Sequence, residues 1–501
     1  MLFTQLEFIF VFLPITVAGY FLVGRLTESP WPRLAWLTIA SLSFYAYWDV
    51  LFLPVIIASM VCNYLLARLI DWKALKIVRV WIFAVAILAN ILALAFYKYT
   101  NFGIDIANLV RKVPIAHLDI VLPLGISFFT FTQIAYLVDV FRGKVIERSF
   151  LKYALFVSYF PHLIAGPILH HAEMMPQFGS AGSRRMSSER TAIALTIFAI
   201  GYFKKAIIAD GFALIANPVF TAAGQSSVTM MDAWGGALAY SLQIYFDFSG
   251  YCDMAIALSL LFGIRLPFNF DAPYKAQSIA EFWRRWHITL SRFLRDYLYI
   301  ALGGNRHGVI IRNINLFVTM LLGGLWHGAG WTFIIWGGLH GLYLIVNHLW
   351  SEFFGRLPVL AKASGTIWYS VAALALTQFS VVVAWVFFRA ESLDMADGIL
   401  SGMFGLADAR KLATETYVSG SVALAIAAGY LICLIMPNVN AMFADRYVGL
   451  ITYDNKRPWS ITDIRWMPSP QWAIAASLVL VAAITTTWLA GDGSQFLYFQ
   501  F

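Results

Sequence analysis

Long apolar stretches recur along the whole chain, and they constrain its fold more than any other feature. A helix needs roughly 20 mostly apolar residues to cross a bilayer. Eight stretches approach that length: residues 6–23, 50–70, 80–97, 120–140, 191–208, 367–388, 419–436 and 472–489. Five more are shorter, more polar or rich in glycine: residues 34–48, 153–169, 234–262, 314–326 and 331–349. The sequence therefore predicts an all-α polytopic membrane protein with about 11 to 13 membrane-embedded helices.

Charged residues make up only 12% of the chain, whereas 60% of its residues are apolar. Soluble domains carry about 25% charged residues, so most of this surface must face something other than water. The net charge is +8, and lysines and arginines gather between the apolar stretches. By the positive-inside rule, these connections are predicted to face the cytoplasm. The residues are Lys73, Lys76, Arg79, Arg184, Arg185, Arg190, Lys204, Lys205, Arg284, Arg285, Arg292, Arg295, Arg306 and Arg312. Without a soluble basic domain, nucleic-acid binding is not expected.

We expect one integral-membrane domain, residues 1–490, followed by a C-terminal tail, residues 491–501. The first apolar stretch lacks a basic leader and a small-residue cleavage site, which favours a retained span over a signal peptide. The three cysteines lie scattered in apolar stretches, with neither metal-ligand nor disulfide spacing. They are Cys62, Cys252 and Cys433. No metal site is therefore expected.

The segment from Glu281 to Tyr299 is too charged to cross a membrane, yet it is strongly amphipathic. Apolar residues recur every three or four positions, which predicts a helix with one apolar face. These residues are Phe282, Trp286, Leu290, Phe293 and Tyr297. Such a helix is suited to lying at, or dipping into, the membrane interface. A plain surface helix, however, does not explain His287 among them.

His327 has the most unusual setting of the nine histidines. Four glycines surround it in the block Gly323-Gly-Leu-Trp-His-Gly-Ala-Gly330. Bare backbone allows close approach of a ligand chain or of a neighbouring helix. The residues alone therefore leave two alternatives, a catalytic imidazole or a tightly packed helix pair. His340 lies in a similar glycine-rich block, and we expect it to be structural.

Asp247 and Asp253 lie in an otherwise apolar stretch. Ionisable groups inside a membrane are costly, so each is a functional candidate. The two carboxylates would either orient a histidine or bind a polar substrate, or else join helices as polar contacts. The loop Leu302-Gly-Gly-Asn-Arg-His-Gly308 could hold a phosphate through backbone N–H groups and Arg306. It fits neither a P-loop nor a dinucleotide-binding motif.

Six blocks of sequence lie between residues 122 and 344. They are Leu122-Pro-Leu-Gly-Ile-Ser-Phe128, Phe160-Pro-His-Leu-Ile-Ala-Gly-Pro167, Tyr245-Phe-Asp-Phe-Ser-Gly-Tyr251, Glu281-Phe-Trp-Arg-Arg-Trp-His287, Leu302-Gly-Gly-Asn-Arg306 and Gly323-Gly-Leu-Trp-His-Gly328. Together they resemble the membrane-bound O-acyltransferase (MBOAT) superfamily. The resemblance is to its bacterial branch of alginate O-acetyltransferase membrane subunits, which is related to the membrane proteins of peptidoglycan O-acetylation and teichoic-acid D-alanylation. Each block alone would be weak evidence, but the set is specific.

The resemblance implies a curved helical body with a tunnel joining the two membrane faces. His327 matches the superfamily's catalytic histidine, and His287 matches its second active-site position. The implied activity moves an acetyl group from a cytoplasmic thioester to a periplasmic or cell-surface polysaccharide such as alginate. Acetyl-CoA is then the expected co-substrate, with no bound cofactor. A periplasmic acyltransferase is the expected partner, and the bacterial inner membrane the expected location.

The chemistry of such a transfer assigns roles to these residues. A thioester is already activated, so the enzyme must deprotonate a weak hydroxyl nucleophile and hold both reactants in line. Since a neutral imidazole suits that task near pH 7, we expect His327 to be the general base. We expect His287 to polarise the thioester carbonyl or to orient the acceptor. The expected substrate and donor contacts are Arg284, Arg285, Arg306, Asp247 and Trp326.

The chain ends in Gly491-Asp-Gly-Ser-Gln-Phe-Leu-Tyr-Phe-Gln-Phe501, with four aromatic residues among the last six. An aromatic anchor at the membrane interface would explain this tail. The tail also resembles the aromatic-tyrosine terminal motif of envelope acylation systems in this branch. That resemblance implies that Tyr498 re-enters the tunnel from the outer face and accepts the acyl group as a covalent ester. Tyr498 would then present the ester to a periplasmic acyltransferase.

Other functions remain open from the residues. A polytopic transporter would explain the spans, the glycines and the intramembrane carboxylates, but not the two histidine motifs, and no inverted halves are visible. Within the superfamily, the acceptor could instead be peptidoglycan, teichoic acid or a lipid. The sequence itself names none of these acceptors.

Overall fold

The computed structural model describes residues 1–72, 76–144, 148–180, 185–354, 365–408, 416–446, 448–451, 462, 464–491 and 496–497. Among these residues, nine helices are long and apolar enough to cross a membrane, and two shorter helices are also apolar. The prediction of an all-α polytopic membrane protein is therefore confirmed. Helices cover all of the predicted apolar stretches at least in part.

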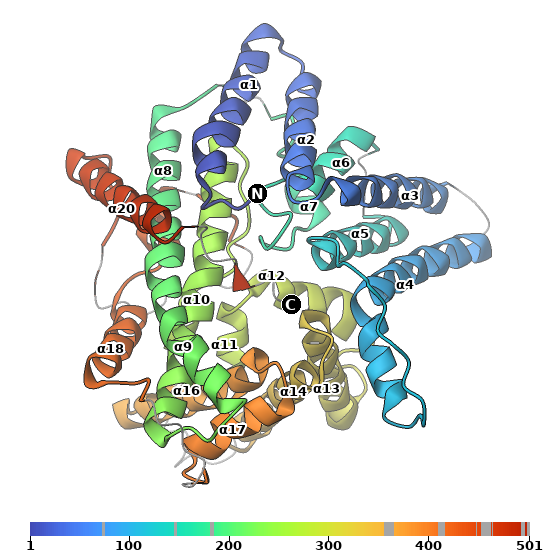
Figure 1. Cartoon of the computed structure of the whole chain (residues 1–501). Helices are drawn as coiled ribbons and strands as arrows, with labels where there is room; N and C mark the ends of the chain where they lie inside the picture. The colour runs from blue at the N-terminus through green and yellow to red at the C-terminus, as the bar shows by residue number, and fades with distance from the viewer. Residues whose placement is uncertain are drawn as a thin grey trace.

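The N-terminal half forms ten of the helical segments, which Figure 1 shows in blue to green. They are α1 (Leu13–Leu26, after the π-helical turn η1, Phe8–Phe12), α2 (Trp31–Ala46), α3 (Leu53–Asp71, after η2, Val50–Phe52), α4 (Lys76–Asn108), α5 (Ile126–Phe141), α6 (Phe150–Ser158), α7 (His171–Met174), α8 (Ser188–Phe203), α9 (Asp210–Ala223, joined to α8 by the π-helical turn η4, Lys204–Ala209) and α10 (Met230–Leu261).

The C-terminal half adds twelve further described helical segments after α10. They are η5 (Pro273–Lys275), α11 (Ile279–Arg285), α12 (Ile288–Phe293), the π-helical turn η6 (Leu294–Tyr299), α13 (Gly308–His327), α14 (Trp331–Phe354), α16 (Ile367–Arg389), α17 (Leu393–Met403), α18 (Gly420–Ile435), α19 (Val439–Met442), η8 (Ala444–Arg446) and α20 (Pro470–Leu489).

The central helix is α10, around which much of the protein packs. Its spanning window is buried along the full length, whereas that of α20 is buried over only 6%. The continuous stretch α8–η4–α9 packs along α10 (Figure 1). Residues 234–262 are more polar than a typical membrane-spanning segment. α10 tolerates these polar side chains because it is enclosed by protein, which offers them partners that lipid could not supply.

Two lysines predicted to lie in a cytoplasmic connection lie instead inside a span. Lys204 and Lys205 begin η4, within the continuous helix Ser188–Ala223. Lys204 pairs with Asp253 at 2.6 Å, and Lys205 pairs with Asp247 at 2.9 Å. Each ammonium therefore meets a buried carboxylate of α10, which compensates the cost of placing its charge there. The two carboxylates thus join helices.

The amphipathic segment from Glu281 to Tyr299 is not one helix. α11 ends at Arg285, and α12 begins at Ile288, after His287 adopts a left-handed backbone conformation with φ of 43°. The N–H of Ile288 donates to the carbonyl of Asn269, at 3.0 Å. The spacing of apolar residues continues unchanged across this break between α11 and α12. For that reason the apolar periodicity of the sequence did not predict the break. The segment enters the protein interior at this point, with His287 fully buried.

Glycines bring α13 and α14 into backbone contact near His327. A methyl group added to Gly324 would overlap the carbonyl oxygen of Phe333 and lie 3.0 Å from Cα of Gly337. Small residues allow helices in a membrane to approach this closely. Of the two alternatives for the glycine-rich block, the packed helix pair is therefore realised. A role for His327 in catalysis does not conflict with that packing.

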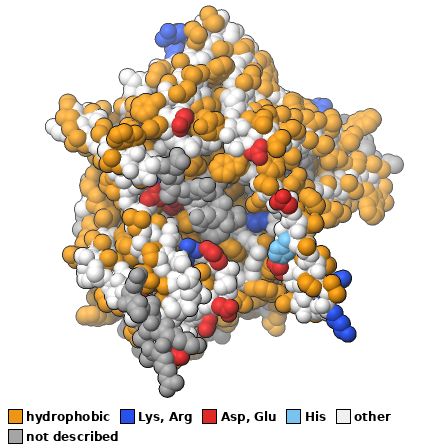
Figure 2. Space-filling model, viewed as in Figure 1, with side chains coloured by type: hydrophobic (Ala, Val, Ile, Leu, Met, Phe, Trp, Pro, Cys, Tyr) orange, Lys and Arg blue, Asp and Glu red, His pale blue; other side chains and the backbone are white. Residues whose placement is uncertain are grey.

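The outer surface is mostly apolar. Hydrophobic side chains cover most of the rim of the face in Figure 2, where charged side chains are sparse. Large apolar residues on separate helices are widely exposed, among them Trp81, Leu214 and Leu478. An exposed apolar surface of this extent is suited to contact with lipid tails.

Candidate active site

His327 is the last residue of α13, and its imidazole is buried among aromatic rings. The ring centroids of Trp326, Trp336 and Phe388 lie 4.8, 5.1 and 5.1 Å from that of His327. α13, α14 and α16 thus each supply a wall of the same aromatic enclosure. Such an enclosure excludes water and restricts the orientation of the imidazole.

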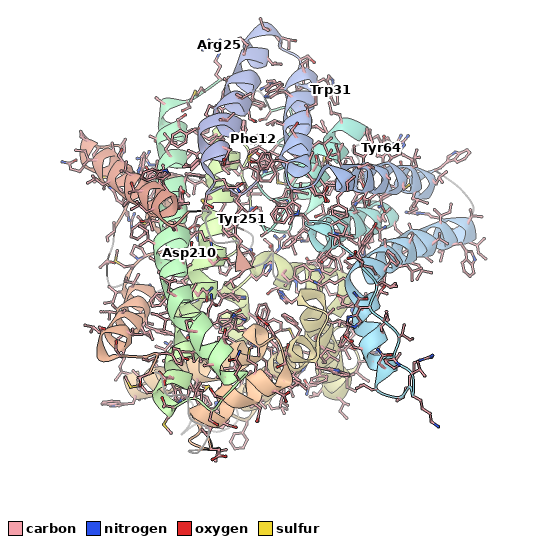
Figure 3. All side chains as sticks on the ribbon, in the orientation of Figure 1. Phe12, Arg25, Trp31, Tyr64, Asp210 and Tyr251 are labelled. Atoms are coloured by element: carbon pink, nitrogen blue, oxygen red, sulfur yellow. The ribbon has the colours of Figure 1, made fainter. Side chains whose placement is uncertain are left out.

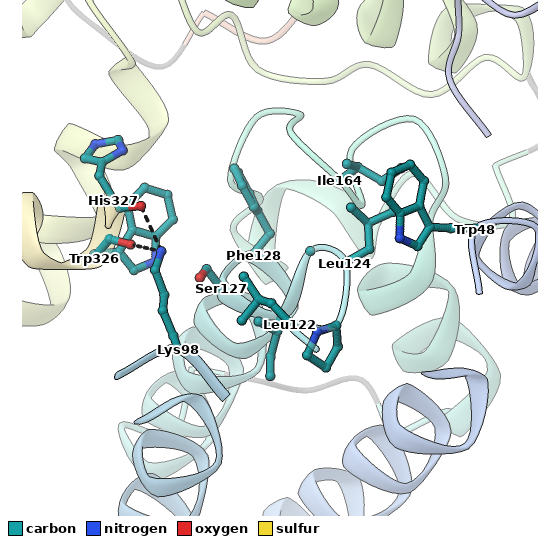
Figure 4. Close-up of a pocket in the computed structure, with 12 residues that line it drawn as sticks. Trp48, Lys98, Leu122, Leu124, Ser127, Phe128, Ile164, Trp326 and His327 are labelled. Carbon is teal, nitrogen blue, oxygen red and sulfur yellow. Dashed lines mark hydrogen bonds between the residues drawn. The ribbon is translucent and has the colours of Figure 1, made fainter. Parts of the chain in front are cut away.

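Two consecutive residues of α4 hold the end of α13. The ammonium of Lys98 donates to the carbonyl oxygens of Trp326 and His327, at 2.6 and 2.8 Å, and the hydroxyl of Tyr99 donates to that of Leu325, at 2.8 Å. Carbonyls at a helix C-terminus have no partner within the helix, and the helix dipole there favours a cation. Lys98 therefore supplies both the hydrogen-bond donor that these carbonyls lack and the positive charge that the helix dipole favours. Figure 4 shows the imidazole of His327 pointing away from Lys98, while its carbonyl faces the ammonium.

His287 lies beside His327 although the two are far apart in sequence. Their ring centroids are 6.4 Å apart. Nδ1 of His287 lies 3.1 Å from the side-chain oxygen of Asn269, which also accepts the N–H of Thr289 at 3.2 Å and the hydroxyl of Thr289 at 2.9 Å. The ring of Phe248, from α10, packs edge-on against His287 at 4.8 Å. Asn269 and Phe248, from two separate parts of the fold, thus hold this imidazole.

This network assigns a tautomer to His287. A backbone N–H can only donate, so the Asn269 atom that meets Thr289 must be the oxygen. An oxygen of this kind can only accept, so Nδ1 of His287 must carry a hydrogen and donate it to that oxygen. Burial lowers the pKa of His287, which lies outside the nine spans, to about 3. His287 is thus neutral at pH 7, and its Nε2 is an acceptor.

A cavity of about 120 Å³ reaches His327 from one end of α13 (Figure 4). Its walls include Lys98, Trp326 and His327 and all of residues 122–128, one of the blocks that carried the family resemblance. The block forms the turn into α5, where Gly125 has φ of 67° and precedes the first helical residue. Its position explains why an apolar turn far from the histidines in sequence belongs to the same site.

A second cavity, of about 440 Å³, lies toward the other end of α13 and is lined by Trp283, Arg312 and Met320 among others. Met320 lines the second cavity and Trp326 lines the first, and the two residues are about 9 Å apart along the axis of α13. The two cavities therefore lie at different heights along this helix. The ring of Trp336 contacts Trp283 at 5.8 Å and His327 at 5.1 Å. The rings of Trp336 and Trp283 therefore lie between His327, which lines the first cavity, and the second cavity, which Trp283 lines.

Two residues of the C-terminal tail, Phe496 and Leu497, are docked inside the protein. Phe496 and Leu497 are buried, with 1% and 4% of their surfaces exposed. The N–H of Leu497 donates to the carboxylate of Asp247, at 3.2 Å. Asp247 precedes Phe248 in α10, and the ring of Phe248 packs against His287 at 4.8 Å. Tyr498 itself lies outside the described residues.

The three arginines proposed to bind the donor differ in their surroundings. Arg284 and Arg306 are exposed. Arg285 pairs with Glu281 at 2.7 Å and donates to the carbonyl of Asp271 at 3.1 Å, so its guanidinium already has partners within the protein. Of the described residues, no group of three or more His, Cys, Asp or Glu side chains is placed to hold a metal ion.

Sequence reasoning missed Lys98 and Asn269. Lys98 ends an apolar stretch, and a lone cation there was a usable signal because such a charge needs a partner. Asn269 lies in an ordinary connection with no comparable signal. Of the predicted residues, His287, His327 and Trp326 lie close together in the fold, whereas Asp247 contacts Lys205 and Leu497.

Comparison with known proteins agrees with this architecture. Residues 46–388 match the MBOAT, membrane-bound O-acyltransferase family. The chain is 46% identical to the peptidoglycan O-acetyltransferase of Helicobacter pylori, over 81% of this chain and 80% of that protein. It is 41% identical to the probable alginate O-acetylase of Pseudomonas aeruginosa, over 81% and 75%. It is 29% identical to the teichoic acid D-alanyltransferase of Streptococcus thermophilus, over 45% and 57%. The chain therefore belongs to the membrane-bound O-acyltransferase family, and it is a multi-pass membrane O-acyltransferase.

Proposed function

We propose that this enzyme moves an acetyl group from cytoplasmic acetyl-CoA across the bacterial inner membrane for O-acetylation of a cell-envelope polysaccharide. The observation that carries the proposal is the pair of histidines, whose ring centroids are 6.4 Å apart, with His327 lining the cavity of about 120 Å³. The names of two relatives, a peptidoglycan O-acetyltransferase and a probable alginate O-acetylase, favour acetyl as the acyl group. Membership of an acyltransferase family removes the transporter alternative.

The basic loops suggest which cavity faces the donor. Arg306 precedes α13. Arg312 lies in the first turns of α13 and lines the cavity of about 440 Å³. By the positive-inside rule, that end of α13 faces the cytoplasm. The donor's phosphates would then meet Arg306 and Arg284, with Arg285 acting mainly through its contacts to Glu281 and Asp271. The thioester would reach inward past Trp283.

In the proposed reaction, His327 is the general base. It removes the proton of an acceptor hydroxyl, whose oxygen attacks the thioester carbonyl carbon. A C–O bond forms, the C–S bond breaks, and the proton passes from His327 to the leaving thiolate, so that the products are an ester and a free thiol. The aromatic enclosure keeps bulk water from competing with the hydroxyl.

The tautomer of His287 favours one of its two expected roles. A neutral ring with hydrogen on Nδ1 has an acceptor at Nε2, and this atom can receive a hydrogen bond from the acceptor hydroxyl. Polarising the thioester carbonyl would need a donor there, and hence a protonated ring. We therefore assign His287 to orienting the hydroxyl.

The first acceptor in this proposal is the phenol of Tyr498. Docking of Phe496 and Leu497 beside α10 supports a tail that re-enters the protein. The resulting acetyl-tyrosine ester would be passed to a polymer hydroxyl by a periplasmic partner, regenerating the phenol. Alginate and peptidoglycan are the acceptors that the relatives' names favour, while teichoic acid or a lipid is the alternative.

Turnover of the donor tests the assignment of His327. Purified protein in lipid vesicles is incubated with acetyl-CoA, and free thiol is measured. His327→Ala should reduce thiol release to background while the protein keeps its size-exclusion profile, because it removes the imidazole that takes the proton of the hydroxyl. His117→Ala, which changes an exposed histidine paired with Asp105, is the matched control. Thiol release by His327→Ala at the wild-type rate would refute the assignment.

A further inference from the structure

Four contacts hold Phe496 and Leu497 of the tail in the centre of the protein. The carboxylate of Asp247 accepts the N–H of Leu497, at 3.2 Å. The ammonium of Lys205 lies over the ring of Phe496, at 5.0 Å from its centroid. The ring of Tyr251 meets that of Phe496 edge-on, at 4.7 Å, and Leu497 belongs to a buried apolar cluster that also includes Phe248 and Trp286. Figure 3 labels Tyr251 and Asp210, which lie on α10 and α9 in this region.

Lys205 and Asp247 are both almost completely buried. Their side chains are 2% and 3% exposed and are 2.9 Å apart, and Lys205 also pairs with Asp210, at 2.7 Å. Buried ion pairs contribute little to stability compared with apolar side chains of the same size. The neighbouring pair Lys204–Asp253 already joins the same two helices. A role in joining α10 to η4 therefore does not by itself explain why the protein also contains the buried pair Lys205–Asp247.

Lys205 lies in a π-helical turn, η4, that interrupts the regular α-helix between α8 and α9. Such turns are uncommon and are often found at functional sites. Here the turn carries two adjacent lysines that both reach carboxylates of α10, although adjacent residues of a regular helix point about 100° apart. The irregular turn thus makes the second pair possible.

We propose that the buried pair Lys205–Asp247 is a dock that fixes the position of the C-terminal tail, so that Tyr498 is presented to the histidines. This proposal rests on the tyrosine relay of the proposed function and names the residues that position it. Lys205 and Asp247 are positioning residues, since they contact the tail before Tyr498 and not the reacting atoms. Recognition is through the backbone of residue 497 and the ring of residue 496.

The dock fixes the register of the tail one residue before Tyr498. The N–H of Leu497 is tied to Asp247, and the next residue of α10, Phe248, packs against His287 at 4.8 Å. A shift of the tail by one residue would move the following side chain by about 3.3 Å. Misplacement of that size is enough to prevent in-line attack. Phe496 opposes such a shift, because its ring is enclosed by Lys205 and Tyr251.

The dock also allows the tail to leave. Lys205 remains paired with both Asp210 and Asp247 when the tail is withdrawn, so no buried charge is left without a partner. Among the described residues, release breaks the hydrogen bond from Leu497 to Asp247 and the contacts of the Phe496 ring with Lys205 and Tyr251. A relay requires this, because the acetylated tyrosine must reach a partner outside the tunnel.

The first test measures docking without measuring catalysis. In a chain whose three native cysteines are replaced by alanine, Leu497→Cys keeps the backbone N–H and reports burial through its rate of reaction with a maleimide. Asp247→Leu should raise that rate at least about tenfold, because it removes a hydrogen bond to a charged acceptor. Asp253→Leu, which breaks the neighbouring pair, is the matched control and should leave the rate unchanged. An unchanged rate in Asp247→Leu, or an equal rise in both variants, would overturn the dock.

The second test changes only the tail, so that misfolding of the membrane body cannot explain the result. Leu497→Pro removes the N–H that Asp247 accepts, and Leu497→Ala keeps it. Acetyl bound to Tyr498, measured by peptide mass spectrometry after incubation with acetyl-CoA, should fall at least about tenfold in the proline variant relative to the alanine variant. The KM for acetyl-CoA should be the same in both. Equal acetylation of the two variants would overturn the positioning role.

The two tests separate failure of the dock from failure of the relay. If Asp247→Leu exposes Leu497→Cys but the wild-type chain carries no acetyl group on Tyr498, the relay is wrong and the dock is supported as a tail-binding site. If Tyr498 is acetylated equally in wild type and in Asp247→Leu, the relay is supported and the positioning role is overturned.

Discussion

The contacts of Asn269 determine what His287 can do. One amide oxygen receives the N–H and the hydroxyl of Thr289 and the Nδ1–H of His287, within 3.2 Å. A buried polar group of this kind is expensive to leave without partners, so the three donors and the acceptor fix one another. The same oxygen therefore sets both the position of the ring and its tautomer.

Replacing this amide should impair chemistry more than binding. Asn269→Leu has a similar size but no acceptor, so the ring of His287 loses both its orientation and its tautomer. We expect kcat to fall about 100-fold, the effect of a small misplacement at a reacting centre, with the KM for acetyl-CoA nearly unchanged. Thiol release in a single turnover, followed at a series of acetyl-CoA concentrations, measures the rate constant of transfer and the half-saturating donor concentration, which stand for kcat and KM in the purified protein. A wild-type kcat in a folded Asn269→Leu protein would contradict the role assigned to His287.

Lys98 should support both the stability of the protein and the position of His327. Lys98→Met keeps the length of the side chain but loses two charge-assisted hydrogen bonds to the end of α13. We expect a loss of about 2 kcal/mol in stability and a lower kcat. Lys98→Arg, which keeps the charge, should recover part of both. Lys76→Met, at the exposed start of the same helix, serves as the control.

Thermal unfolding in detergent and donor turnover are the two measurements for Lys98. If Lys98→Met unfolded at the same temperature as Lys76→Met and turned over acetyl-CoA at the wild-type rate, the ammonium would not be needed at the end of α13. Loss of stability alone, with kcat retained, would restrict Lys98 to a structural role.

Among single residues, those with unusual sequence surroundings could be predicted. His327 and His287 stood out because a titratable group among glycines, or on an apolar helical face, needs an explanation. Lys98 acts on a carbonyl 228 residues away in the chain, and no local pattern reports such a contact. The break at His287 was also hidden, because a residue other than glycine in a left-handed conformation is uncommon.

At the scale of the helices, α13 and α14 form the rigid unit that carries His327. Gly324 and Gly337 let the two backbones touch, and the aromatic residues of α14 then reach the imidazole. Packing density in such a contact leaves no room for an added methyl group. The glycine-rich block is therefore needed for the position of the base as well as for helix packing.

Alanine substitutions test this contact. Gly324→Ala should separate α13 from α14 and destabilise the protein by about 1 to 3 kcal/mol, the usual cost of overpacking, with a loss of donor turnover. Gly338→Ala is the matched control, because its methyl group would meet only side-chain carbons, at 3.7 and 3.9 Å. Thermal unfolding of the two variants decides the matter. Equal unfolding temperatures for both would show that the close contact is not required.

The elements themselves followed well from hydropathy, with informative exceptions. Most spans were predicted because lipid-facing helices must be apolar over their full length. The lysines of η4 were misplaced into a loop, since a rule based on charge alone does not foresee that each would meet a carboxylate of α10. Pairing in the interior changes the cost of a charge, and pairing is a property of the fold.

For the whole molecule, the proposed function depends on the arrangement of the cavities and the tail. One cavity reaches His327 past the turn before α5, the other lies toward the basic end of α13, and the rings of Trp336 and Trp283 lie between His327 and the second cavity. The tail, last in the chain, packs against α10 near its middle. The family resemblance implied a tunnel, but the contact between the tail and Asp247 brings together residues 250 positions apart, which no sequence pattern showed.

The most direct test of this account follows the acetyl group itself. Purified wild-type protein, His327→Ala and Tyr498→Phe are incubated with acetyl-CoA carrying a radiolabelled acetyl group, and protein-bound label is measured and mapped to a peptide. The account predicts stable label on the C-terminal peptide of the wild type and on neither variant, because His327 drives attack by the phenol of Tyr498. Label retained at the wild-type level by Tyr498→Phe would contradict the tyrosine relay, and label retained by His327→Ala would contradict the assignment of the base.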